Sequence, residues 1–144
     1  MAREKSDIRA LLDRFSEALA EGDFALASEW CDLPCTIVRP TGTILIQTAQ
    51  EAAEDLEAIW STYRERGVCG LRYKILDQRS YVEGLALGDV EWELLDTHGH
   101  VPVTFNSTYG IRQAGDTLKV TLIMAHNEVF QRPYGSESQP GCEA

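Results

Sequence analysis

All the predicted helices come before the four long β-rich runs of the chain, and this order limits the folds that it can adopt. Before Gly67 most apolar residues recur at helical spacing, whereas residues 71–130 hold β-rich runs separated by turns. Helices that all precede the main strands must cover one face of the resulting sheet. The order predicts an α+β domain in which a curved, mostly antiparallel sheet of about six strands wraps three N-terminal helices around an apolar pocket.

The helical segments carry recognisable start and stop signals. The first predicted helix has apolar residues at positions 8, 11, 12, 15, 18 and 19 and ends at Gly22. Asp23 is a suitable N-cap for a short second helix over residues 24–31. The capping box Thr48–Glu51 opens a long third helix, which Gly67 ends.

The strand segments complete one domain. Two short strands, Cys35–Arg39 and residues 42–47, are predicted to form a hairpin, and four long strands follow the third helix. We therefore assign residues 1–130 to a single domain. Residues 131–144 are polar and rich in helix and strand breakers, so we predict a disordered tail.

Composition excludes several classes of protein. A formal net charge of −10 opposes binding to the phosphates of nucleic acid, and no apolar run is long enough to span a bilayer. The first residues lack an apolar signal core, so we expect a soluble, cytoplasmic protein.

The four cysteines lack metal-site spacing, and free thiols are expected at Cys31, Cys35, Cys69 and Cys142. No cofactor motif occurs, and we predict no cofactor or metal.

The element order supports a resemblance to a known family. Residues 8–23, Trp30 and residues 35–42 resemble the nuclear-transport-factor-two-like superfamily, which includes SnoaL-like proteins and ketosteroid isomerases. The resemblance extends over residues 6–130. It implies a cone-shaped, cystatin-like α+β domain with a deep pocket, often a homodimer, whose function ranges from isomerase or cyclase to non-catalytic binding module. A homodimer through the outer face of the sheet would cover the apolar residues there.

The resemblance also implies where isomerase chemistry would lie. The carboxylate base of those enzymes falls on Arg39, which cannot accept a proton at neutral pH. Their oxyanion donors fall on Phe15, which has no hydroxyl group, and near Thr104 or Asn106. The resemblance therefore implies a fold and a pocket but not steroid isomerase activity.

Two charged or titratable residues are candidates for site chemistry. Arg39 could hold a carboxylate or phosphate in two hydrogen bonds, or form a salt bridge at the pocket rim. His126 could act as a general acid or base, or be a hydrogen-bonded core histidine. Thr104 and Asn106 would join His126 if the polar side of the strand over residues 101–111 faces inward, whereas a bulge would turn its apolar side inward. We expect the polar side to face inward.

Aromatic residues could supply flat walls for a ring-containing ligand, although core packing is their other common role. The candidates are Trp30, Trp60, Tyr63, Tyr73 and Trp92. The sequence thus favours a protein that binds a small hydrophobic molecule, acidic or ring-containing, without catalysis. A lyase, cyclase or isomerase that uses His126 is the alternative, and a dimerisation or interaction module is a third possibility.

Overall fold

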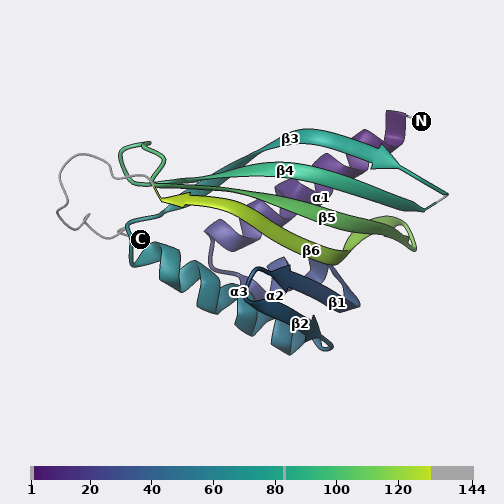
Figure 1. Ribbon diagram of the computed structural model, residues 1–144, viewed down its shortest axis with the longest axis horizontal. Coiled ribbons are helices and arrows are strands. Elements are labelled where there is room, and N and C mark those ends of the chain that lie inside the picture. Colours follow the sequence, from purple (N-terminus) through teal and green to yellow (C-terminus); the bar gives the residue numbers. More distant parts are fainter. Residues whose placement is uncertain (1, 83, 131–144) are drawn as a thin grey trace.

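The computed structural model describes residues 2–82 and 84–130. The predicted disordered tail, residues 131–144, lies outside the described residues. The elements follow in the order α1 (Ala2–Ala20), α2 (Phe24–Ala27), the 3-10 turn η1 (Ser28–Trp30), β1 (Cys31–Arg39), β2 (Gly42–Ile46), α3 (Ala49–Arg64), β3 (Gly70–Ser80), β4 (Leu85–Leu95), β5 (Val103–Ala114) and β6 (Thr117–Phe130) (Figure 1). This α+β order matches the prediction.

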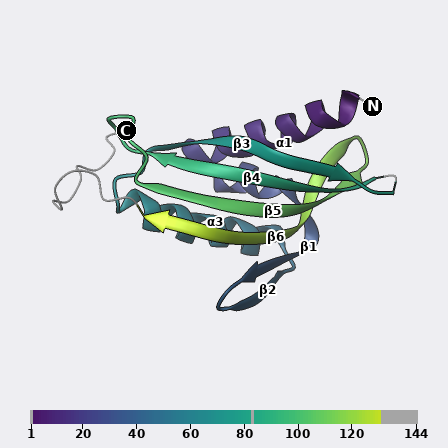
Figure 2. The same ribbon diagram turned by 45° about the horizontal axis from the view of Figure 1, so that its top comes forward.

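The strands form one six-stranded sheet in the order β2-β1-β6-β5-β4-β3. Neighbouring strands run antiparallel except β1 and β6, which run parallel. Figure 2 shows the β1–β2 hairpin turned away from the broad surface of β3–β6, so the sheet is strongly curved. The fold class is confirmed, with one parallel pair in an otherwise antiparallel sheet.

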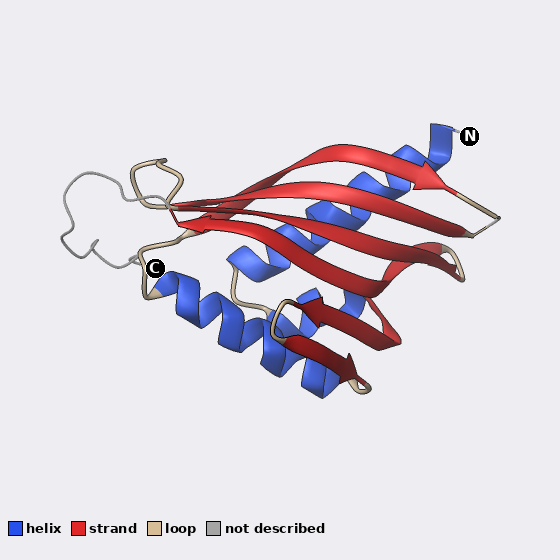
Figure 3. Ribbon diagram, in the orientation of Figure 1, coloured by secondary structure: helices blue, strands red, loops and turns tan. Residues whose placement is uncertain are grey.

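The helices α1 and α3 lie on the same side of the sheet (Figure 3). Helix α1 contacts β3 and β6, while α3 contacts β1 and β2. We call the side that carries the helices the inner face and the opposite side the outer face. On β4 the inner face is marked by Val90, Trp92 and Leu94, each 1% exposed, so the core lies between the sheet and the helices.

The predicted helix signals act as expected. Gly22 adopts φ +78° and ends α1, and the Asp23 carboxylate accepts a hydrogen bond from the Leu26 amide at 3.1 Å. At α3 the Thr48 hydroxyl accepts from the Glu51 amide at 3.1 Å, and Glu51 accepts from the Thr48 amide, completing the capping box. Helix α1 begins at Ala2, before the signals that the sequence offers.

The segment after α2 differs from the prediction. The second helix ends at Ala27, and after the η1 turn β1 begins at Cys31 and continues through Pro34. The strand therefore starts four residues before the predicted Cys35, because a bulge accommodates the proline. Cys31 and Cys35 are free thiols, but Cys69 is disulfide-bonded, which corrects the expectation of a free thiol there. Across the described ranges, no helix has the length and apolarity to cross a membrane.

Candidate functional site

Aromatic side chains fill the space between the sheet and the helices. The rings of Phe15 and Trp30 are stacked with centroids 3.6 Å apart, and the ring of Trp92 meets Phe15 edge-on at 5.9 Å. The Trp92 Nε1 donates to the Tyr109 hydroxyl at 2.8 Å. Burial raises the pKa of Tyr109 to about 12. Trp92, a candidate wall for a ligand, therefore packs in the core, which is the other role expected for these aromatic residues.

Two further predicted wall residues also serve packing. Trp60 is 2% exposed, and its Nε1 has no hydrogen-bond partner in the described part of the chain. The Tyr63 ring stacks on Phe105 with centroids 6.3 Å apart, and its hydroxyl donates to the Glu128 carboxylate. Burial and this carboxylate raise the pKa of Tyr63. Tyr63 thus connects α3 to β5 and β6, while Trp60 belongs to the hydrophobic core.

The polar side of β5 faces outward, contrary to the expectation for Thr104 and Asn106. Tyr109 and Phe105 point to Trp92 on the inner face, so the residues between them point the other way. A register shift on β6 between Val120 and Leu122 also turns His126 outward. The apolar side of β5 therefore faces inward, which was the alternative expected if a bulge interrupted the sheet.

On the outer face, His126 joins a short chain of hydrogen bonds. The Thr108 hydroxyl donates to the Asp89 carboxylate at 2.6 Å, and the His126 Nε2 lies 3.1 Å from the same hydroxyl oxygen. Since the single hydroxyl proton goes to Asp89, Nε2 is the donor to Thr108. His126 therefore does not remove a proton from Thr108, and the sheet separates His126 from the aromatic interior. Asn106 lies directly across from His126, as predicted, but outside the domain interior.

Arg39 forms a salt bridge, but it lines neither of the two cavities that the described residues enclose. Its guanidinium lies 3.3 Å from the Asp55 carboxylate of α3, and the two side chains are 29% and 23% exposed. This pair holds the end of β1 to α3. The charge of Arg39 is thus already partnered within the domain.

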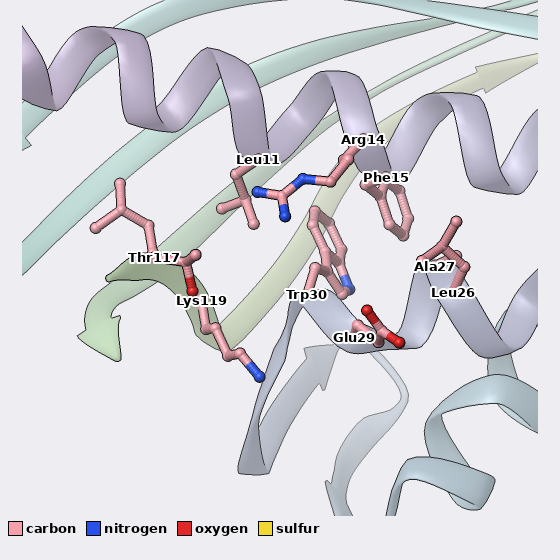
Figure 4. Close-up of a pocket in the computed structure, with 10 residues that line it drawn as sticks. Leu11, Arg14, Phe15, Leu26, Ala27, Glu29, Trp30, Thr117 and Lys119 are labelled. Carbon is pink, nitrogen blue, oxygen red and sulfur yellow. The ribbon is translucent and has the colours of Figure 1, made fainter. Parts of the chain in front are cut away.

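A cavity of about 260 Å³ opens beside the stacked Phe15 and Trp30 rings. Figure 4 shows Arg14 entering it from α1, Trp30 and Glu29 from η1, and Lys119 from the start of β6. The remaining lining residues are Leu11, Leu26, Ala27, Thr117 and Leu118. The cavity therefore combines a flat apolar floor with charged groups at its edge.

The charges of this cavity are unusual for so acidic a chain. Among the described residues, neither Arg14 nor Lys119 forms an ion pair, although the chain carries a net charge of −10. A second hollow of about 310 Å³ lies where α1 meets β3, but Arg9 is its only cation and no aromatic ring lines it. The first cavity is the better candidate for an anionic ligand.

The sequence of residues 3–128 matches the family model described as NTF2-like protein (DUF6841). The chain belongs to this NTF2-like family. No curated protein matches it. A cystatin-like-fold protein of unknown function from Nostoc punctiforme is 14% identical with a TM-score of 0.70, covering 87% of this chain and 77% of that one.

Two other solved structures show the same fold. An NTF-2 like protein of unknown function from Shewanella oneidensis is 18% identical with a TM-score of 0.67, covering 85% of this chain and 98% of that one. A ketosteroid isomerase-like protein from Erwinia carotovora atroseptica is 13% identical with a TM-score of 0.63, covering 83% and 92%. At these identities the likeness shows the NTF2-like fold alone.

In this NTF2-like chain, Trp30 is the one predicted site residue that lines the cavity. Sequence reasoning missed Arg14 and Lys119. Arg14 lies beside Phe15 at the edge of the apolar stripe of α1, which is a position that many solvated arginines occupy. Lys119 lies far along the chain, and no spacing rule connects it with Arg14. Arg14 and Lys119 line the same cavity only because of where β6 lies relative to α1.

Proposed function

We propose that this NTF2-like protein binds a small, ring-containing carboxylic acid in the cavity between α1, η1 and β6, without transforming it. The observation that carries the proposal is the pair of cations, Arg14 and Lys119, beside the Phe15–Trp30 stack. A carboxylate would contact the cations while the ring of the ligand lies on the aromatic floor.

The size of the cavity limits the ligand. Its volume of about 260 Å³ is just below the usual range of roughly 300–1,000 Å³ for small-molecule sites. One or two fused rings with an acidic side chain match that volume better than a steroid. The acidic Glu29 at the rim would disfavour a second negative group on the far side of the ligand.

Isothermal titration of aromatic monocarboxylates, such as benzoate and naphthoate, against their neutral amides tests the proposal. Arg14→Gln and Lys119→Gln should each weaken carboxylate binding by about two- to fivefold, the range for a solvent-accessible ion pair. Amide binding should be unaffected by both changes. Lys74→Gln is the matched control, because Lys74 is an exposed cation on β3, outside the cavity lining.

Three results would reject this function. Carboxylates and amides could bind equally well, Lys74→Gln could weaken binding as much as Arg14→Gln does, or none of the acids could bind. Raising the ionic strength should also weaken the carboxylates selectively, since salt screens exposed charges.

We also propose a homodimer through the outer face of the sheet. Large apolar side chains are exposed on that face, with Leu45 at 51%, Leu85 at 42% and Met124 at 40%. A second copy would cover them and would place Asp89 and His126 near the interface.

Sedimentation of Leu45→Glu and Met124→Glu variants should show monomers. Ile59→Glu on α3, which lies on the other side of the sheet, is the matched control. A wild-type monomer at high concentration would contradict the proposal.

A further inference from the structure

Cys31 and Cys35 lie on the same strand, β1, where its pairing with β6 is irregular. Cys31 pairs with Val120 of β6 and Thr36 pairs with Leu122, so five steps along β1 match only two along β6. At about 3.3 Å per residue a regular strand would separate residues 31 and 36 by roughly 17 Å, whereas two steps of β6 span roughly 7 Å. The bulge folds the intervening residues out of the ladder.

This folding places the two sulfur atoms in the same buried environment. Cys31 is 9% exposed and Cys35 is 0% exposed, and both belong to the hydrophobic core. The compressed span brings their backbones close to the Cα separation of about 4.4–6.8 Å that a disulfide requires. Other cysteines in the described residues play no part in this pair, since Cys69 is already disulfide-bonded.

Each thiol also shifts the pKa of the other. Hydrogen bonding with Cys35, followed by burial, raises the pKa of Cys31, and hydrogen bonding with Cys31 lowers the pKa of Cys35. Cys35 is thus the thiol that loses its proton more readily. A thiolate next to a second thiol is the arrangement from which disulfides form.

We propose that Cys31 and Cys35 are a redox-active dithiol that a small peroxide converts into an intrachain disulfide. Hydrogen peroxide, a small molecule, would approach the pair from the side of the cavity. Trp30 precedes Cys31, and Lys119 adjoins the residue that pairs with Cys31, and both side chains line the cavity. Larger thiol reagents would be excluded because both sulfur atoms are buried.

The reaction proceeds in two balanced steps. The Cys35 sulfur attacks one peroxide oxygen, the O–O bond breaks, and a sulfenic acid forms while the other oxygen leaves as water with the thiol proton. The Cys31 sulfur then attacks the sulfenic sulfur, the S–S bond forms, and the S–O bond breaks to release a second water with the Cys31 proton. The two sulfur atoms lose two electrons in total, and the peroxide gains them.

Peptide mapping of the full chain tests this dithiol. Trypsin does not cut between Arg39 and Pro40, so residues 15–64 form one tryptic peptide that contains Cys31 and Cys35 and no other cysteine. After the folded, reduced protein is treated with peroxide and then alkylated, this peptide should carry no alkyl group and should have lost the mass of two hydrogen atoms. Dithiothreitol should restore two alkylation sites.

Single-cysteine variants provide the control. In Cys31→Ser or Cys35→Ser, the peptide of residues 15–64 should keep one alkylation site or gain oxygen, and it should never lose two hydrogen atoms. The wild-type measurement decides the question even if a variant fails to fold. Two alkylation sites that persist at a peroxide concentration that oxidises glutathione would overturn the proposal. So would separate oxidation of each thiol to a sulfinic acid.

Discussion

Replacing Tyr109 with phenylalanine tests whether the domain interior is as solid as the aromatic packing indicates. The change removes one oxygen atom, which accepts the hydrogen bond from the Trp92 Nε1 at 2.8 Å. Trp92 is 1% exposed and Tyr109 is 4% exposed, so the orphaned donor has no route to bulk water. A buried donor without a partner costs about 1–3 kcal/mol, and we expect Tyr109→Phe to lower the free energy of unfolding by ~2 kcal/mol.

The assay is urea denaturation followed by tryptophan fluorescence, with thermal unfolding as a second measure. A loss of ~2 kcal/mol corresponds to a decrease in Tm of roughly 4–8 °C for a domain of this size. The matched control is Tyr73→Phe, because the Tyr73 hydroxyl bonds to Asp13 at 2.6 Å in an exposed position. Its carboxylate partner can return to water, so the control should lose less than about 1 kcal/mol.

A double-mutant cycle sharpens the test. In a Trp92→Phe background the indole donor is already absent, and Tyr109→Phe should then cost much less than in the wild type. If the single Tyr109→Phe change costs under about 0.5 kcal/mol, water has taken the place of the hydroxyl. The interior would then hold open space, and the conclusion that the aromatic rings fill the cone would be refuted.

Three further predictions follow from the described contacts. The free energy of unfolding should fall by up to ~3 kcal/mol as the pH rises from about 10 to 12, because the Tyr109 pKa is about 12 in the folded state and near 10 when unfolded; an equal decline in Tyr109→Phe would contradict this. Thr48→Ala should lower unfolding stability by about 1 kcal/mol in urea titrations, through loss of the α3 capping box; no change would show that the exposed cap is replaced by water. Arg39→Gln should lower the free energy of unfolding by less than about 1 kcal/mol in the same urea titrations, since its ion pair with Asp55 is partly exposed. It should leave the affinity for the ligand unchanged. Weaker ligand binding would show that Arg39 belongs to the site.

Much of the fold could be predicted because its signals are local. Gly22, Asp23 and the capping box at Thr48 fix where helices end and begin through contacts within a few residues. The order of helices and strands then leaves few ways to cover the sheet. The parallel pairing of β1 with β6 has no local signal, because it joins segments far apart in the sequence.

The site was harder to predict because side-chain direction depends on strand register. Reading β6 as an unbroken alternation puts Val120 and His126 on one face, but they lie on opposite faces because a register shift separates them. Asn106 and His126 are cross-strand neighbours on the outer face, whereas Thr104, the third member of the expected cluster, pairs with Val129. A single sequence therefore predicts which residues are cross-strand neighbours more readily than it predicts which face of the sheet their side chains occupy.

The register shift on β6 also explains where the proposed chemistry lies. The irregularity lies between Val120 and Leu122. These two residues pair with the irregular part of β1 along one edge of β6 and with Ile111 and Gly110 of β5 along the other edge. The same irregular place therefore turns His126 away from the interior and brings Cys31 close to Cys35. It also places Lys119 at the cavity edge, next to the last residue before the shift. The regular part of the sheet packs against aromatic side chains. We therefore expect ligand binding and redox chemistry where the ladder is interrupted. A change that removes the irregularity of β6 should abolish both.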